Sequence, residues 1–249
     1  MDRRILKLDL KTSLRCIADL VMPRVCVVCG RDLIPQERDI CLPCLEELPR
    51  ARFFSLSRNP MADKLNARID DSRYCYATAL FLYNSTSPYR NIPQELKYRR
   101  NFSAGRRFSS ILGKELAGSG LFRDVDLVIP VPLSRIRKWK RGYNQAEIIA
   151  REVASALNAT LDCKSLRRIR NTDTQTRLSV QDKQKNVKGA FKAVRQPSTG
   201  RREFKHILIV DDVFTTGSTA AECHKALREV FGTQTRISVA TLAFVSDWI

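Results

Sequence analysis

The 249-residue chain has no run of about 18 apolar residues, so the sequence predicts no membrane-spanning helix. It has no Gly-Lys-Ser/Thr sequence, which excludes a P-loop, and no internal repeat, which excludes a solenoid. Of its two histidines, His206 precedes a predicted strand and His224 lies about a turn into a predicted helix. Both are interpreted as structural, and no side chain stands out as a general base.

We also expect no secretory signal. The start of the chain is basic, and Asp9, Lys11, Arg15 and Asp19 interrupt the apolar positions that follow. We therefore expect a cytoplasmic protein with no membrane insertion. The content of 43% hydrophobic and 28% charged residues is that of a folded soluble protein. The length allows one full core with a small appendage, or two modest domains.

Acidic residues are scarce, with 26 Asp and Glu against 44 Lys and Arg, a net charge of +18. Between Arg135 and Lys205 there are 19 basic and 6 acidic residues, which gives +13 of that total. One interpretation is a solvated surface. The other is a surface for polyanions, either nucleic acid or ligand phosphates. A small phosphate ligand needs only a few basic residues, so the larger number present favours nucleic acid.

Two Cys-x-x-Cys units stand near the front, separated by eleven residues; they supply Cys26, Cys29, Cys41 and Cys44. In a cytosolic chain such pairs favour a metal over disulfides, and four thiolates at this spacing can close a tetrahedral structural zinc site. A site of four cysteines has no open position, so no catalysis is assigned to it. Reduced cysteines or a redox pair are the alternative.

The remaining cysteines, Cys16, Cys75, Cys163 and Cys223, have no paired spacing and are interpreted as small buried apolar residues. Apolar positions between Ile5 and Val21 predict a helix that Pro23 limits near Met22. We expect this helix to dock the zinc module onto the main domain.

The most informative segment is Ile207–Thr219, in which four apolar residues lead into Asp211 and Asp212 and then into a loop of hydroxyl residues and glycine. The pattern predicts a buried parallel strand that ends at the acid pair, a tight turn, and a helix that starts near Thr219. Free N–H groups of that helix and the loop hydroxyls suit a phosphate, and the carboxylates suit sugar hydroxyls or a metal. The alternative is that the acid pair only caps a helix.

Other segments follow a strand–helix order that argues for a mostly parallel sheet. Strands are expected at 74–83, 126–133 and 237–245, helices at 92–118, 146–157 and 219–231, and a connector at 50–72. Between strand 126–133 and helix 146–157 we expect a cationic loop at the ligand-facing edge of the sheet. It contains Arg135, Arg137, Lys138, Lys140 and Arg141, and Trp139 within it suits either base stacking or simple packing.

The segment Ile207–Thr219 resembles the 5-phosphoribosyl-1-pyrophosphate (PRPP) motif of type I phosphoribosyltransferases. Together with the cysteine pairs, Val128–Pro132, Lys140–Ala146 and Thr174–Phe191, it resembles the ComF family of phosphoribosyltransferase-like competence proteins over nearly the whole chain from about Val21. One departure is Lys183, where the family usually has arginine. Lysine keeps the charge but loses the two-pronged hydrogen-bonding geometry.

This resemblance implies a type I phosphoribosyltransferase-like α/β fold, a mostly parallel sheet with an N-terminal four-cysteine zinc module. We expect the module at residues 1–50 and the phosphoribosyltransferase-like domain at 51–249. The resemblance places Asp211 and Asp212 at the ribose as catalytic residues, and pyrophosphate at the loop after Pro132, with residues near 170–188 as a flexible cover. The PRPP contacts implied are Asp211, Asp212, Val213, Thr215, Thr216, Gly217, Ser218 and Thr219, and the pyrophosphate and cover residues are Arg135, Arg137, Arg141 and Lys183.

The function implied is the handling of incoming single-stranded DNA in natural transformation, with PRPP and Mg²⁺ as ligands and a helicase-like or DNA-processing partner. Three hypotheses remain open: a phosphoribosyltransferase with an unidentified acceptor, a non-catalytic single-stranded-DNA-binding factor that keeps the pocket, and a PRPP-responsive regulator. The intact acid pair favours ligand binding, and the basic stretch favours nucleic acid. The candidate nucleic-acid contacts are Lys138, Trp139, Lys140 and Arg141.

Overall fold

The structure is a computed structural model that describes residues 24–170, 188–195 and 203–246. The chain divides into two compact units, Met1–Leu48 and Pro49–Ile249. The expected helix between Ile5 and Val21, Cys16, Lys183 and nearly all of the expected cover lie outside the described residues. Within the described ranges, no helix combines the length and apolar character needed to cross a bilayer.

Residues 24–48, the described part of the smaller unit, contain little regular structure. Isolated bridges join Val25 to Asp32 and Arg38 to Ile40, and one short helix, α2 (Leu42–Glu46), follows with a proline in its first turn. Its buried apolar residues are few: Cys26, Val27, Val28, Ile40, Cys41, Cys44 and Leu48. Three of the seven are cysteines, so this core is small without a further cross-link.

The larger unit is built on a five-stranded sheet in which every neighbouring pair is parallel. Its spatial order is β1 (Ala77–Tyr83), β7 (Arg236–Val245), β6 (His206–Phe214), β2 (Leu127–Pro130) and β3 (Thr160–Leu161). A second, antiparallel pair consists of β4 (Leu166–Arg168) and β5 (Phe191–Ala193). The expected α/β fold with a mostly parallel sheet is confirmed.

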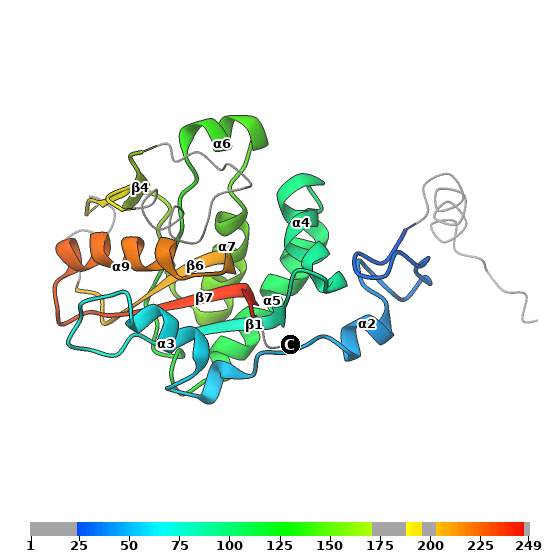
Figure 1. The fold of residues 1–249 in the computed structure, drawn as a ribbon, viewed down its shortest axis with the longest axis horizontal. Helices are drawn as coiled ribbons and strands as arrows, with labels where there is room; N and C mark the ends of the chain where they lie inside the picture. Colours follow the sequence, from blue (N-terminus) through cyan, green and yellow to red (C-terminus); the bar gives the residue numbers. More distant parts are fainter. Residues whose placement is uncertain (1–23, 171–187, 196–202, 247–249) are drawn as a thin grey trace, which may run out of the picture. The chain divides into compact units, whose positions relative to one another are not determined.

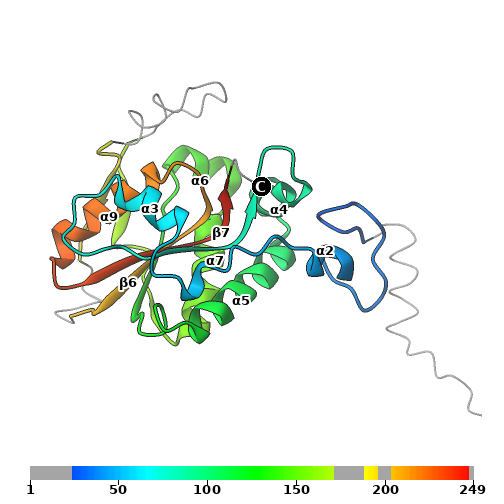
Figure 2. The same ribbon diagram turned by 60° about the horizontal axis from the view of Figure 1, so that its bottom comes forward.

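Helices cover both faces of the sheet (Figures 1 and 2). On one side lie α5 (Phe102–Gly118) and α7 (Gln145–Leu157), and on the other α3 (Pro60–Asn66) and α9 (Ser218–Phe231). Buried residues of α7 recur at helical spacing, from Ala146 and Ile149 to Val153 and Leu157. Helix α5 approaches α7 closely at Gly113, where a Cβ atom would lie 2.7 Å from the Cβ of Ala156.

The remaining helices are short. They are η1 (Phe53–Ser55), η2 (Pro88–Arg90), α4 (Asn91–Tyr98) and α6 (Arg135–Arg141). Helix α4 and helix α5 cover the helical stretch expected at 92–118, and residues 99–101 separate them.

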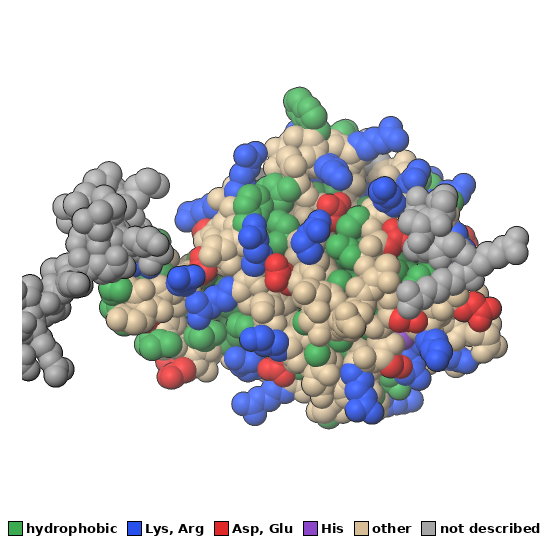
Figure 3. Space-filling view, turned by 180° about the vertical axis from the view of Figure 1, so that it is seen from behind, with side chains coloured by type: hydrophobic (Ala, Val, Ile, Leu, Met, Phe, Trp, Pro, Cys, Tyr) green, Lys and Arg blue, Asp and Glu red, His purple; other side chains and the backbone are tan. Residues whose placement is uncertain are grey.

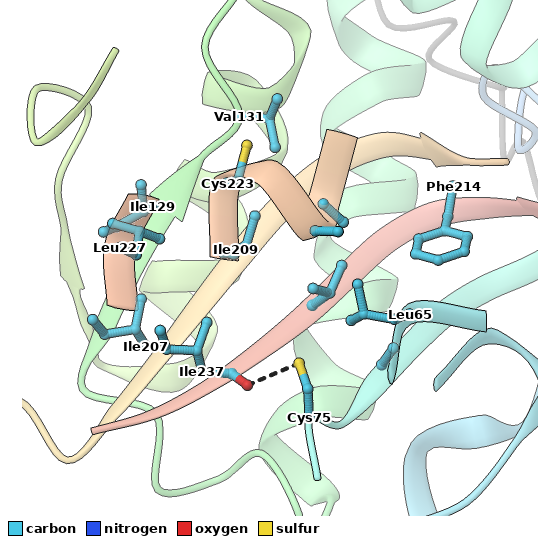
Figure 4. Close-up of a cluster of buried hydrophobic side chains, with 14 of the residues drawn as sticks. Leu65, Cys75, Ile129, Val131, Ile207, Ile209, Phe214, Cys223, Leu227 and Ile237 are labelled. Atoms are coloured by element: carbon cyan, nitrogen blue, oxygen red, sulfur yellow. Dashed lines mark hydrogen bonds between the residues drawn. The ribbon is translucent and has the colours of Figure 1, made fainter. Parts of the chain in front are cut away.

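The core beneath α9 is apolar because the central strands are covered on both faces (Figure 4). Ile207 and Ile209 of β6 pack with Cys223 and Leu227 of α9 in this cluster. At its edge the Cys75 thiol donates to the Ile237 carbonyl at 3.0 Å. Cys75 and Cys223 are buried as expected, whereas Cys163 is exposed, so the interpretation of that residue as buried was wrong.

Two secondary-structure predictions need correction. The expected connector at 50–72 contains α3, whose start is set by Asn59: its side chain accepts from the N–H groups of Met61 and Ala62, and Pro60 supplies the first turn. Strand β6 does not end at Asp211 and Asp212 but continues to Phe214, because β7 is long enough to pair with Val213 and Phe214.

Both histidines occupy buried positions. His206 bridges Asp124 at 2.7 Å and Ser238 at 2.8 Å, and burial lowers its pKa. The order acid, histidine, serine resembles a hydrolytic triad, but Ser238 is fully buried and has no access to a substrate. Nε2 of His224 lies 3.1 Å from Asp71, and burial with nearby Arg228 lowers the pKa of His224 to about 4.

Candidate functional site

The topology creates a natural ligand position at the carboxyl ends of β2 and β6. From β2 the chain passes through α7 to β3 on one side, and from β6 it passes through α9 to β7 on the other. Because α7 and α9 cover opposite faces, the connections that leave the neighbouring strands β2 and β6 run to opposite sides of the sheet (Figure 2). Open α/β sheets bind ligands in the crevice at such a switch point.

A small pocket, partly open to solvent, lies at this position. It is lined by Val131 at the end of β2, by Ile209, Asp211, Val213 and Phe214 of β6, by the loop residues Thr215, Thr216, Gly217, Ser218, Thr219 and Ala220, and by Val239 and Thr241 of β7. The structure therefore brings together all of the sequence-predicted PRPP residues except Asp212.

The loop Thr215–Gly217 is held in one shape by local contacts. Gly217 has φ of 81°, and a Cβ atom there would lie 2.7 Å from the ring of Phe214, so only glycine fits. The hydroxyls of Thr216 and Ser218 lie 3.0 Å apart, and the Arg68 guanidinium donates to the Thr216 carbonyl. Gly217 also precedes α9, so the first N–H groups of that helix face the loop. This arrangement suits an anion.

The acid pair is split between the two faces of the sheet. Successive side chains of a strand point to opposite faces, so Asp211 follows Ile207 and Ile209 into the pocket beneath α9. Asp212 points the other way and is absent from the pocket lining. Its carboxylate instead meets Lys97 of α4, with Nζ 2.9 Å from Oδ2.

Lys97 is a residue that sequence reasoning missed. Helix α4 stands beside the carboxyl end of the sheet (Figure 1). The available signal was the position of α4 just after strand β1, because residues that follow the carboxyl end of a parallel strand gather at the ligand edge.

The electrostatics of Asp211 follow from this placement. Burial and the neighbouring Asp212 carboxylate raise the pKa of Asp211 to about 7, and Lys97 and Arg168 oppose that rise. The N–H of Asp212 donates to the Asp211 carboxylate at 2.8 Å, which also favours the ionised form. Near neutral pH the free pocket therefore holds Asp211 close to its ionisation midpoint, and a ligand that donates hydrogen bonds would favour the ionised state.

The expected cationic loop is a short helix, α6, because Ser134 caps its first turn and Gly142 ends it. This helix separates the basic residues that the sequence grouped together. Arg137 acts with burial to lower the pKa of Arg168, a residue of β4 that sequence reasoning missed and whose charge also acts on Asp211. Arg135, Lys138 and Lys140 are exposed.

Trp139 is 85% exposed, which rules out the interpretation that it simply packs against its neighbours. Tyr98, at the end of α4, is 70% exposed, and the Arg141 guanidinium lies 5.2 Å from its ring centroid. Two exposed aromatic residues thus lie on helices α4 and α6, with Arg141 stacked on one of them. Lys and Arg side chains are spread widely over the face in Figure 3.

The four predicted zinc ligands come together in the smaller unit. The sulfur atoms of Cys26, Cys29, Cys41 and Cys44 all lie within 4.8 Å of one another, and those of Cys29 and Cys41 are 3.8 Å apart. A tetrahedral zinc site with Zn–S bonds of about 2.3 Å has sulfur atoms roughly 3.8 Å apart. The N–H groups of Val28 and Cys41 both point at the Cys26 sulfur at 3.4 Å, as is usual around a thiolate ligand. The cluster is compatible with a structural zinc ion.

Glu37 connects the segments that carry the two cysteine pairs, and it was not predicted from the sequence. Its buried carboxylate accepts from the N–H of Leu42 at 2.8 Å and of Ile34 at 3.2 Å, and from Arg31 at 2.6 Å. The Leu42 hydrogen bond is the main cause that lowers the pKa of Glu37. The carboxylate therefore fixes the segment between the two cysteine pairs.

Comparisons with known proteins point in one direction, although no family model matches the chain. The chain is 32% identical over 146 residues to Competence protein F of Haemophilus influenzae, covering 57% of this chain and 63% of that protein. It is 33% identical over 143 residues to the DNA utilization protein YhgH of Escherichia coli K12, covering 56% and 61%. It is 27% identical over 227 residues to Competence protein ComFC of Bacillus subtilis, covering 88% and 80%.

The resemblance to the ComF family is confirmed by these relatives, and the chain spans a little over 60% of the length of the first two. Among solved structures, glutamine PRPP amidotransferase from B. subtilis matches with a TM-score of 0.34 and 22% identity, over 55% of this chain and 26% of that one. No function is inferred from a likeness that distant.

Proposed function

We propose, from its similarity to ComF-family proteins, that the chain binds PRPP in the pocket at the end of β6 and acts in natural transformation, in the handling of single-stranded DNA. The observation that carries the first part is the convergence of Asp211, the Thr215–Thr219 loop and the start of α9 on one pocket. A ligand with a phosphate next to a sugar diol needs hydrogen-bond donors for the phosphate and acceptors for the diol. The names of the relatives support the second part.

In this proposal each part of the pocket meets one part of PRPP. The loop hydroxyls and the first N–H groups of α9 hold the 5-phosphate. The Asp211 carboxylate accepts hydrogen bonds from the ribose hydroxyls in the pocket. Asp212, outside the pocket lining and held by Lys97, remains a proposed ribose contact. Arg137 and Arg168 supply positive charge for the pyrophosphate, since both lie within electrostatic range of the pocket acid or of each other. Arg135, Arg141 and Lys183 remain proposed pyrophosphate or cover residues.

Magnesium would come with the ligand and neutralise charge on the pyrophosphate as it departs. The protein groups fit this arrangement better than a dedicated metal cage, because Asp212 is already engaged by Lys97 and Asp211 is the pocket's only lining carboxylate among the described residues. The protein would hold the ribose and its phosphates in place while Mg²⁺ stays on ligand oxygens and water.

If the pocket is catalytic, the reaction is phosphoribosyl transfer: the bond from C1 of the ribose to pyrophosphate breaks, and a bond to an amine or ring nitrogen of an acceptor forms. The arginines would stabilise the leaving charge. The acceptor is not identified. The same pocket without turnover would serve a DNA-binding factor or a PRPP-responsive regulator, and a helicase-like or DNA-processing protein is the proposed partner.

Calorimetric titration of the wild type with PRPP and Mg²⁺ tests the pocket directly. We expect micromolar binding that falls at least tenfold in the Asp211→Asn/Asp212→Asn double variant, because each amide keeps one acceptor oxygen but loses the negative charge that strengthens hydrogen bonds from the ribose diol. An Asp70→Asn variant, on an exposed residue away from the pocket, is the matched control and should bind as the wild type does. Absence of PRPP binding by folded wild type would overturn this proposal.

A nucleic-acid surface is the second candidate, favoured by the exposure of Trp139 and Tyr98 among basic residues. We propose that single-stranded DNA stacks its bases on these rings while Lys138, Lys140 and Arg141 meet its phosphates. Basic residues beside exposed aromatic rings are the usual composition of surfaces that bind single strands without reading sequence.

Alanine at Trp139 or at Tyr98 should weaken binding of a labelled oligothymidine by roughly 5- to 100-fold each, because base stacking contributes about 1–3 kcal/mol. Trp139→Phe should keep most of the affinity. Lys140→Ala should reduce the slope of log affinity against log salt concentration by about one, because one phosphate contact is lost. Lys114→Ala on α5 is the control for loss of an exposed charge. Affinity that is flat between low and high salt would exclude this surface.

A further inference from the structure

The two carboxylates of the acid pair have different surroundings, although they are neighbours in sequence. Asp211 faces the pocket, and Asp212 faces α4, where the Lys97 ammonium lies 2.9 Å from its Oδ2. Both partners are shielded, with 11% of the Asp212 side chain and 24% of the Lys97 side chain exposed. An ion pair this shielded is screened much less by salt than a surface pair.

Helix α4 is fixed firmly enough to present Lys97 at a defined place. Ile92, Pro93 and Leu96 form its buried face, and Leu96 packs tightly over Gly105 of α5. The Tyr143 hydroxyl, just before α7, donates to the Leu96 carbonyl. Leu96 is therefore held both by α5 and by Tyr143, which fixes the backbone position of its neighbour Lys97 beside the edge of the sheet.

Lys97 acts on both members of the pair. Asp212, Asp211 and Tyr83 at the end of β1 are the titratable groups that face it, and their charges together favour its protonated form against its own desolvation. Asp211 in turn faces Asp212 and Lys97, with Arg168 on β4 and the Cys223 thiol on α9. Lys97 is thus the cation in direct contact with the pair among the described residues.

We propose that Lys97 is a positioning residue for the ribose site: it fixes the orientation of Asp212 and favours the ionised form of Asp211 for a ligand that donates hydroxyl hydrogen bonds. This inference rests on the proposed PRPP pocket. Without Lys97 the charge of Asp212 would act on Asp211 with less opposition, and Asp211 would hold its proton to higher pH. A protonated acid donates where the ribose also donates, so the diol would lose an acceptor.

A purely structural ion pair would behave differently. Its loss would lower stability and would leave the pH profile of ligand binding unchanged. A positioning role moves that profile, because without the positive charge of Lys97 more alkaline conditions are needed before Asp211 ionises.

Titrations of PRPP with Mg²⁺ between pH 6 and pH 9 on wild type, Lys97→Met and Lys97→Arg separate the two roles. We expect Lys97→Met to bind at least tenfold more weakly at pH 7 and to recover part of its affinity by pH 9. Lys97→Arg should restore most of the affinity, since arginine keeps the charge. Lys114→Met, on the neighbouring helix α5, makes the same chemical change at an exposed position and should match the wild type.

Carboxyl carbon NMR titration of ligand-free protein gives a reading that does not depend on PRPP. The Asp211 midpoint should move to higher pH in Lys97→Met, and combining that change with Asp212→Asn should cancel most of the movement. Equal PRPP affinity and an unmoved midpoint in a folded Lys97→Met variant would overturn the inference. Absence of PRPP binding by the wild type would instead remove the ribose role with the proposed function, while the NMR result would still decide whether Lys97 controls the pair.

Discussion

Removal of zinc is expected to unfold the residues of the Met1–Leu48 unit that carry the cysteine cluster. Three of the seven buried apolar residues in this unit are cysteines, and α2 is its single helix within the described residues. Segments below about 40 residues seldom fold without a cross-link or a metal. Binding of a structural zinc ion contributes on the order of 10 kcal/mol to the folding of such segments, far more than this small core can.

Elemental analysis should find one zinc ion per chain in the wild type and almost none in Cys26→Ser or Cys41→Ser. A chelator should make residues 24–48 sensitive to protease and collapse their amide NMR dispersion, while the sheet residues of Pro49–Ile249 keep theirs. Cys163→Ser is the matched control, because Cys163 is exposed and lies outside the cluster. A wild-type unit that stays ordered and protected without metal would contradict a structural zinc site.

Asp211→Asn is expected to change binding and stability in opposite directions. In the ligand-free protein the ionised Asp211 carboxylate lowers the stability of the fold, because burial and the Asp212 carboxylate raise its pKa to about 7. Asparagine has the same shape and can still accept the Asp212 N–H through its amide oxygen. PRPP affinity should fall at least tenfold, while the ligand-free fold should gain roughly 1–3 kcal/mol at pH 8.

The pH dependence of that gain distinguishes it from a general stabilisation. An acid whose folded pKa exceeds its unfolded value of 3.8 takes up protons on folding, so its contribution to unfolding free energy declines as pH rises from about 4 to about 7. The advantage of Asp211→Asn over wild type should therefore be small at pH 4, grow through that window and level off above pH 7. Chemical denaturation at several pH values measures it, with Asp70→Asn as the flat control. If the difference in unfolding free energy between Asp211→Asn and wild type were the same at every pH, ionisation of Asp211 would not destabilise the folded protein.

Much of the fold could be predicted from local patterns. The strand at Ile207–Val210 reads as a continuous apolar run, which parallel strands covered on both faces require, and Gly232 ends α9 as its position predicts. The cysteine spacing indicated which four residues would meet, because two Cys-x-x-Cys turns leave few other ways to close a site. The PRPP-like loop was also placed correctly before a helix, since glycine and hydroxyl residues in that order specify the turn.

The predictions that failed have different physical causes. The length of β6 beyond the acid pair depends on β7, a strand more than 20 residues away along the chain. Residues 135–141 form a helix because Ser134 and Gly142 cap them, a signal that the density of positive charge obscured. Trp139 could not be assigned to the surface or the core from its neighbours alone.

The sequence by itself determined the chemical inventory of this protein: four thiols, an acid pair, a hydroxyl loop and a basic stretch, each defined by residues close together along the chain. Only the tertiary structure decided how the acid pair is divided. Strand alternation sends Asp211 into the pocket and Asp212 to the opposite face, and Lys97 reaches Asp212 from a helix more than 100 residues earlier. Local sequence specifies turns and strands through short-range sterics, whereas the charge state of a buried carboxylate depends on every element packed around it.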